Sequence, residues 1–195
     1  MSGDQYKKFK KEVEEHDGLV RVFIHPISAP KGDYQEENYP KVLDVLGRNI
    51  KSKVSPPVII FEETFNMGLW KEKLEQRMPL PNDLYVIPTM RDYPYPIIPG
   101  KPAPTRRDAE GKCLTEDFPY VEEGMTMFIN TCKNAGVKKI LIGGTNLEII
   151  NDQLNRCVGN FINILKNYSE FELKVSMGTA PLNRNDLRDS NPELV

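Results

Sequence analysis

The hydrophobic residues of this chain follow two patterns, short continuous runs and stripes at helical spacing. The short runs are rich in β-branched residues and end at proline, glycine or charged residues, which predicts buried strands. They lie at residues 19–24, 58–61, 84–87 and 138–142. Residues 171–177 instead alternate apolar and polar positions, so we expect a half-exposed strand at the edge of a sheet.

Between the strands, apolar residues recur at steps of three and four, which predicts amphipathic helices. The clearest stripes lie at residues 40–50, 121–132 and 147–165, and weaker patterns lie at 6–15 and 70–78. Cys132 belongs to one of these stripes and is most simply a core residue. Pro88 is expected to end the third strand, because proline cannot continue a central ladder.

The junction between the fourth strand and the last helix allows two arrangements. Thr145 and Glu148 match a capping box, so one long helix is expected from this point, with Cys157 in the middle of its buried stripe. A helix that begins instead at residues 151–152 or at Asn155 would place Cys157 in its first turns. In that second arrangement the thiol would gain the activation that a helix N-terminus provides.

Strands that alternate with helices predict a three-layer α/β/α fold of Rossmann-like kind, with a mostly parallel sheet of about five strands. At 195 residues the chain suits a single domain. Residues 88–119 form a long proline-rich loop, which either packs over the fold or acts as a lid in which Arg106 and Arg107 meet an anion. Residues 181–195 are polar and are expected to form a loosely held C-terminal tail.

Composition narrows the class of protein. Hydrophobic content of 39% and charged content of 28% are ordinary for a soluble globular domain, and the formal net charge of −2 argues against a dedicated nucleic-acid binder. No apolar run approaches the roughly 20 residues that span a bilayer, and the charged N-terminus has no signal-peptide pattern. Three scattered cysteines do not suggest a disulfide framework, so we expect a cytoplasmic protein with reduced thiols.

Candidate chemistry lies just beyond the predicted strands. Parallel strands place their carboxyl ends on one edge of the domain, and ligands of open α/β sheets bind at that edge. The polar residues that follow the strands are His25 and Ser28, Glu62 and Glu63, Arg91 and Asp92, Thr145 and Asn146, and Thr179. The sequence therefore predicts a small-molecule site at this edge.

Three interpretations of the edge compete. In the first, the backbone amides after Gly143 and Gly144, together with Thr145 and Asn146, bind a phosphate or carboxylate at a helix N-terminus, although the pattern lacks a dinucleotide or P-loop fingerprint. The alternative for the same residues is a tight turn with a capping box.

In the second interpretation, His25, Glu62, Glu63 and Asp92 surround a divalent metal. No pair of them has a diagnostic ligand spacing, and charged residues after a strand usually meet water, so no metal site is assigned. In the third, Cys157 is a nucleophile.

Residues 134–144, followed by Cys157 and Val158, resemble the C-terminal part of the isochorismatase-like cysteine hydrolases, and the likeness extends to about residue 166. That family has a strand that ends in glycine and a Cys-Val pair that opens the next helix. The resemblance implies a three-layer parallel fold and a nucleophilic role for Cys157. The chain departs from the family at two positions, with His25 where the family has aspartate and Arg91 where it has lysine.

These observations lead to two functional expectations. The first is a hydrolase-like enzyme that acts on a small polar ligand at the sheet edge, with Cys157 as nucleophile, His25 or Asp92 as base, and Arg91 and Glu62 among the ligand-binding residues. The second is a non-catalytic binding or interaction protein that keeps an enzyme-like fold and uses the proline-rich loop as its contact. Neither expectation includes a nucleic acid or a membrane as partner, and assembly into a homo-oligomer stays open.

Overall fold

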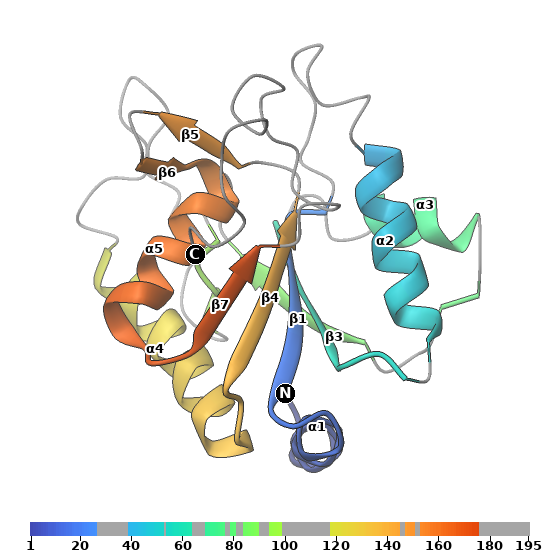
Figure 1. Cartoon of the computed structure of the whole chain (residues 1–195), viewed down its shortest axis with the longest axis horizontal. Coiled ribbons are helices and arrows are strands. Elements are labelled where there is room, and N and C mark those ends of the chain that lie inside the picture. Colours follow the sequence, from blue (N-terminus) through green and yellow to red (C-terminus); the bar gives the residue numbers. More distant parts are fainter. Residues whose placement is uncertain are drawn as a thin grey trace.

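The fold is built on a five-stranded sheet in which every strand pair is parallel (Figure 1). The computed structural model describes residues 1–26, 39–52, 54–63, 69–76, 79–80, 84–89, 94–98, 118–144, 147–150 and 153–175. The strands are β1 (Leu19–Ile24), β2 (Val58–Glu63), β3 (Tyr85–Thr89), β4 (Lys139–Gly144) and β7 (Glu172–Val175). Their order across the sheet is β3-β2-β1-β4-β7, which confirms the predicted sheet and places β7 at an edge.

Helices cover the sheet on two faces, which completes the predicted three-layer fold. Helices α1 (Gly3–Glu15), α4 (Phe118–Ala135) and α5 (Arg156–Tyr168) contribute to one apolar cluster, and α2 (Tyr39–Lys51) and α3 (Leu69–Glu75) contribute to another. Strand side chains alternate between the two clusters, as a pleated strand requires. Phe61 of β2, for example, lies with α4 and α5, whereas Ile60 lies with α2 and α3.

An aromatic group forms the centre of the larger cluster. The ring of Phe61 meets the rings of Phe128 on α4 and Phe161 on α5 edge to face, with centroids 5.0 and 4.9 Å apart. Aromatic pairs favour this geometry because the positive edge of one ring meets the negative face of the other. Cys132 is buried in the same cluster, which confirms its expected core role.

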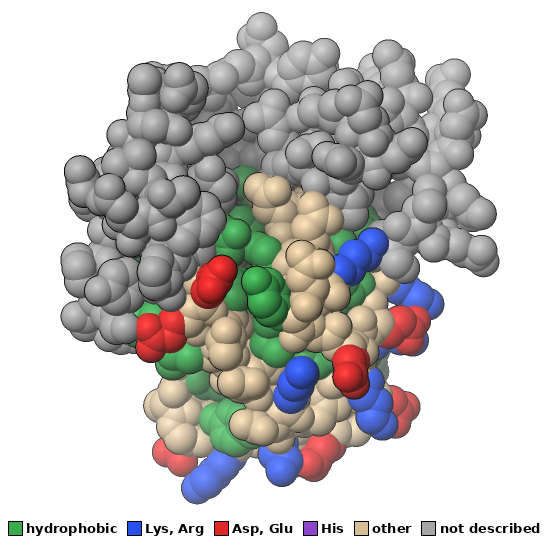
Figure 2. Space-filling model, turned by 90° about the vertical axis from the view of Figure 1, so that its left-hand side faces the viewer, with side chains coloured by type: hydrophobic (Ala, Val, Ile, Leu, Met, Phe, Trp, Pro, Cys, Tyr) green, Lys and Arg blue, Asp and Glu red, His purple; other side chains and the backbone are tan. Residues whose placement is uncertain are grey.

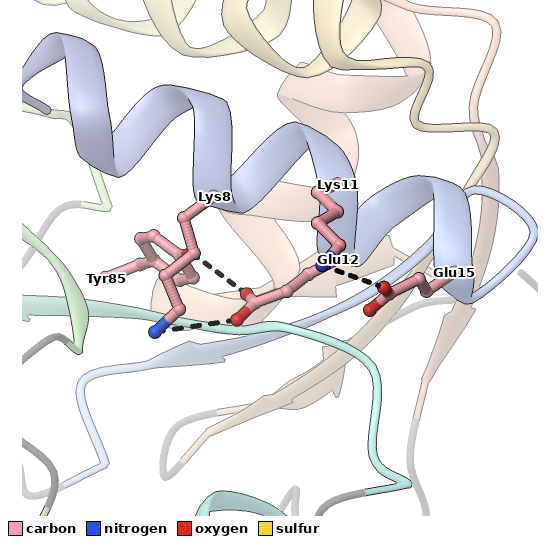
Figure 3. A network of polar contacts seen from close by, with 5 residues as sticks. All are labelled: Lys8, Lys11, Glu12, Glu15 and Tyr85. Atoms are coloured by element: carbon pink, nitrogen blue, oxygen red, sulfur yellow. Dashed lines mark hydrogen bonds and ion pairs between the residues drawn. The ribbon is translucent and has the colours of Figure 1, made fainter.

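Helix α1 lies at the amino-terminal end of the sheet and is held by both apolar and polar contacts. Ser2 caps it in a reciprocal capping box, so the helix begins earlier than the lysine-glutamate pattern predicted. The Tyr85 hydroxyl on β3 donates a 2.8 Å hydrogen bond to Glu12, and Lys8 lies 3.6 Å from the same carboxylate (Figure 3). The pair Lys11–Glu15 continues this row along the helix.

The predicted end of β3 at Pro88 is wrong, because the strand continues to Thr89. Strand β3 is an edge strand, where a missing N–H leaves no central ladder bond unmade. The carbonyl of Pro88 accepts a 2.9 Å hydrogen bond from the Ile97 amide, and Pro96 bridges to Thr89. Both ends of the predicted loop, residues 88–119, are wrong, because residues 88–89 belong to β3 and residues 118–119 begin α4. Between them, residues 94–98 pack along the β3 edge, and the remainder of the predicted lid lies outside the described residues, as does the predicted tail.

The predicted long helix from residue 147 is also wrong. Residues Glu148–Ile150 (β5) and Gln153–Asn155 (β6) pair as an antiparallel hairpin, and the helix begins only at Arg156. Glu148 therefore lies in a strand, which excludes the expected capping box with Thr145. The spacing of Leu147, Ile150 and Leu154 matched a helical stripe by coincidence, although residues 151–152, Asn-Asp, are typical of a turn.

Figure 2 shows the side of the molecule that lies at the left in Figure 1. In its described part, basic and acidic side chains are interspersed around a group of hydrophobic ones. At the β7 edge of the sheet, Glu172 pairs with Lys139 at 2.9 Å and with Lys174 at 3.2 Å. Charged side chains on an edge strand oppose edge-to-edge association, and β7 shows this pattern.

None of the helices in the described residues is long and apolar enough to cross a membrane.

Candidate functional site

From β1 the chain builds the sheet outward in both directions, so the strand order reverses between β1 and β4. Open α/β sheets bind ligands at such a point of reversal. Strands β2 and β3 lie on one side of β1, and β4 and β7 lie on the other. The two central strands run in register to their last residues, with Ile24 beside Gly144. The crevice outside the carboxyl ends of such a strand pair is the usual ligand site of this architecture.

Gly144 joins the ends of both central strands to the first turn of α5. A Cβ atom at this position would collide with the carbonyl oxygen of Ile24 and would lie 2.8 Å from a methyl group of Val158. The backbone also has φ = +153°, a conformation that L side chains rarely adopt. Close packing therefore requires glycine here, and the predicted ligand-binding role of Gly143 and Gly144 stays a prediction.

We expect the substitution Gly144→Ala to destabilise the fold by about 2–4 kcal/mol, because it adds overpacking to backbone strain. Gly136→Ala is the matched control, since Gly136 also has a positive φ (+86°) but a Cβ atom added there would meet nothing within 4 Å. That control should cost about 1 kcal/mol. Urea denaturation of both variants measures the difference, and equal losses would show that the contacts with Ile24 and Val158 do not matter.

Cys157 lies in the first turn of α5, as its second residue. The arrangement with one long helix is thus wrong, and the arrangement with a late helix start is confirmed. The next residue, Val158, lies close to Gly144, so the start of α5 lies beside the end of β4. The first turn of α5 contains no acidic residue, and its positive dipole end is the kind of position at which proteins stabilise thiolates. The side chain is 7% exposed.

His25 follows β1 directly and is held in an unusual conformation. Its φ is +45°, which is uncommon for a residue other than glycine, and its amide donates a 2.8 Å hydrogen bond to the carbonyl of Phe61. The buried ring places Nε2 2.8 Å from the Thr89 hydroxyl and Nδ1 3.7 Å from a carboxylate oxygen of Glu63. Burial lowers the pKa of His25 to about 3, so the imidazole is neutral at physiological pH.

Glu62 and Glu63 are adjacent in β2 and, as neighbours in a strand, point to opposite faces of the sheet. Glu63 points toward His25, whereas Glu62 lies on the face of Ile60, above α2 and α3. The Glu62 carboxyl group is 0% exposed, and its Oε1 accepts a 2.9 Å hydrogen bond from the Glu63 amide. Burial, assisted by the nearby Glu63 carboxylate, raises the pKa of Glu62 to about 9.

The structure therefore brings His25, Glu63 and Thr89 together, with Glu62 on the opposite face of the same strand end. Both carboxyl groups are buried, contrary to the solvated charges that usually follow a strand. Six of the predicted edge residues lie outside the described residues, so their roles stay predictions. They are Ser28, Arg91, Asp92, Thr145, Asn146 and Thr179. Among the described residues, no group of three or more His, Cys, Asp or Glu side chains could hold a metal ion.

Thr89 is the site residue that the sequence did not suggest. Its contact with His25 joins residues 64 positions apart in the chain, which no local pattern reveals. One signal in the sequence could have helped. Proline is tolerated on an edge strand, so treating β3 as an edge strand would have extended it through Pro88 to Thr89.

Comparison with known proteins gives no match at three levels: no family model, no curated protein and no solved structure matches the chain. The class that the structure defines is a three-layer α/β fold with an all-parallel central sheet.

Proposed function

We propose that the chain is a thiol-dependent hydrolase that acts on a small polar substrate at the carboxyl edge of the sheet, with Cys157 as its nucleophile. The observation that carries this proposal is the position of Cys157 in the first turn of α5, beside the end of β4 where the strand order reverses. The resemblance of residues 134–144 and of Cys157-Val158 to isochorismatase-like hydrolases supports the same role.

The proposed reaction has two halves. The Cys157 thiolate attacks a carbonyl carbon of the substrate, so that a C–S bond forms, the bond to the leaving group breaks, and the leaving group takes up a proton. Water then attacks the thioester, the C–S bond breaks, and the sulfur is released as the thiol while the acid product departs. Backbone N–H groups at the start of a helix are donors of the kind that stabilise a developing oxyanion, and α5 begins directly before Cys157.

Two residues are candidates for the base that activates the thiol. Both ring nitrogens of His25 already face other side chains, Nε2 facing Thr89 and Nδ1 facing Glu63. His25 is therefore the less suitable residue to take the proton from the Cys157 thiol. Asp92 follows β3 by three positions in the sequence and is the other candidate. Its substitution by asparagine should therefore have a larger effect on turnover than substitution of His25.

Alkylation of the native protein tests the nucleophile. Iodoacetamide at pH 7, followed by peptide mapping, should modify Cys157 much faster than Cys132. Cys132 is the internal control, because it is buried in the core and burial raises the pKa of its thiol well above the usual range. A Cys157 that reacts only after denaturation would overturn the proposal.

A non-catalytic binding protein is the second candidate function. The observation that favours it is the compact contact of His25 with Thr89 and Glu63, all three buried, which ties the strand ends together rather than presenting them to a substrate. In this case the protein should bind small ligands without turnover, and no acyl adduct should form on Cys157.

A further inference from the structure

Glu62 is a buried group that the proposed reaction does not use. One carboxyl oxygen, Oε1, accepts a hydrogen bond from the Glu63 amide, while Oε2 has no hydrogen-bond partner among the described residues. Leaving a buried polar atom without a partner typically costs about 1–3 kcal/mol. Such groups are rare in native folds, and each calls for an explanation, such as a catalytic role or a bound partner that completes its hydrogen bonding.

The surroundings of Glu62 determine which form of the carboxyl group is present. It follows Ile60 on the same face of β2, whose apolar cluster includes Phe23 on β1, Leu46 on α2 and Leu74 on α3. None of the described basic residues forms an ion pair with it. The group is therefore a neutral acid at pH 7, with an O–H donor at Oε2.

The charge state restricts the ligand. An ammonium group would need an ionised carboxylate, which this site disfavours. A ligand carboxylate would lose its hydration in an apolar setting, and the Glu63 carboxylate, whose charge already helps to raise the pKa of Glu62, disfavours a further negative charge there. An uncharged carbonyl oxygen accepts the Oε2 hydrogen without either penalty.

We propose that Glu62 donates a hydrogen bond to an uncharged carbonyl oxygen of a ligand bound at the carboxyl edge of the sheet. This inference deepens the proposed function, because it names the chemical class that the same edge would accept. It does not depend on which residue is the nucleophile.

Three probes of similar size and different charge test the proposal: acetophenone, benzoate and benzylammonium. Ligand-observed NMR titrations at pH 7 should give measurable binding for acetophenone and at least tenfold weaker binding for the two charged probes. The substitution Glu62→Leu should weaken acetophenone binding at least tenfold. Glu62→Gln should stay within about threefold of the unchanged protein, because an amide keeps a donor and an acceptor at the same place.

Glu75→Gln is the matched control, since Glu75 is an exposed carboxylate on α3 and should leave binding unchanged. Several outcomes would overturn the inference: no acetophenone binding, a preference for benzylammonium or benzoate, equal binding to the Glu62→Leu variant, or a loss with Glu62→Gln as large as that with Glu62→Leu. If Glu62→Leu fails to fold, the glutamine variant and the three-probe preference still decide.

The failure of this inference can be distinguished from that of the proposed function. Cys157→Ala should abolish turnover and leave acetophenone binding intact, whereas Glu62→Leu should reduce binding even in the Cys157→Ala background. Normal turnover with no effect of the Glu62 substitutions would overturn only the role of Glu62.

Discussion

Replacing Cys157 by alanine should lower the turnover of small esters and amides by at least about 10³-fold. The reason is that covalent catalysis depends on one sulfur atom, and removal of a nucleophile typically leaves only the residual catalysis due to binding and oxyanion stabilisation. Initial rates with p-nitrophenyl acetate and a panel of small amides measure the effect. Because Cys157 is mostly buried, the substitution should also lower stability, and because only one sulfur atom is removed the loss should be modest, about 1–2 kcal/mol.

Two further variants separate chemistry from packing. Cys157→Ser keeps the size of the side chain but replaces the thiolate by a much weaker nucleophile, so it should be almost as inactive as the alanine variant. Cys132→Ala removes a core sulfur on α4 and should lower stability while activity persists. Turnover that survives in both Cys157 variants would contradict the nucleophile and favour the binding protein.

The sequence was sufficient for the fold because each main strand and helix has its own local pattern. The buried runs that became β1, β2 and β4 are continuous and bounded, so their existence does not depend on distant contacts. The order of strands could not be predicted in the same way, because it depends on which crossovers pack together. The prediction failed in the segment before α5. There Leu147, Ile150 and Leu154 follow one another at helical steps, but Ile150 and Leu154 belong to the β5–β6 hairpin and Leu147 precedes it.

The site was predicted less completely than the fold, for a physical reason. The rule that ligands bind at the carboxyl edge identified His25, Glu62 and Cys157 as candidates, since it needs only the ends of strands. It could not predict burial of the carboxyl groups, which depends on tertiary packing around β2. It also could not pair His25 with Thr89, because that contact joins the ends of separate strands across the sheet.

The buried titratable groups lead to a prediction about pH. We expect stability to be greatest between about pH 4.5 and 6.5 and to fall on both sides. His25 has a folded pKa of about 3, below its ordinary 6.5, so the unfolded chain binds an extra proton between these values and stability falls as the pH drops through them. Glu62 has a folded pKa of about 9, above its ordinary 4.5, so the folded chain holds the extra proton and stability falls as the pH rises.

Between about pH 4.5 and 6.5 the two effects oppose each other, because the unfolded chain gains one proton at His25 and lacks one at Glu62. Outside that window the folded and unfolded chains differ by one bound proton. That difference changes the free energy of unfolding by about 1.4 kcal/mol per pH unit. A rise from pH 6.5 to 8.5 should therefore cost about 3 kcal/mol. Exposed Glu172, whose pKa is lowered by Lys139 and Lys174, acts in the same direction as His25 on the acid side.

Urea denaturation from pH 3.5 to 9 measures this profile, and two variants assign its limbs. Glu62→Gln cannot ionise and should flatten the alkaline limb while the acid limb persists. His25→Asn, with a residue type that tolerates the left-handed backbone, should flatten most of the acid limb. It should also extend the alkaline limb down to about pH 4.5 at the same slope, because the opposing proton at His25 is gone. If the Glu62→Gln variant still loses stability above pH 6.5 at the same slope, the alkaline limb belongs to another group, and Glu62 is not held as a neutral acid in the folded protein.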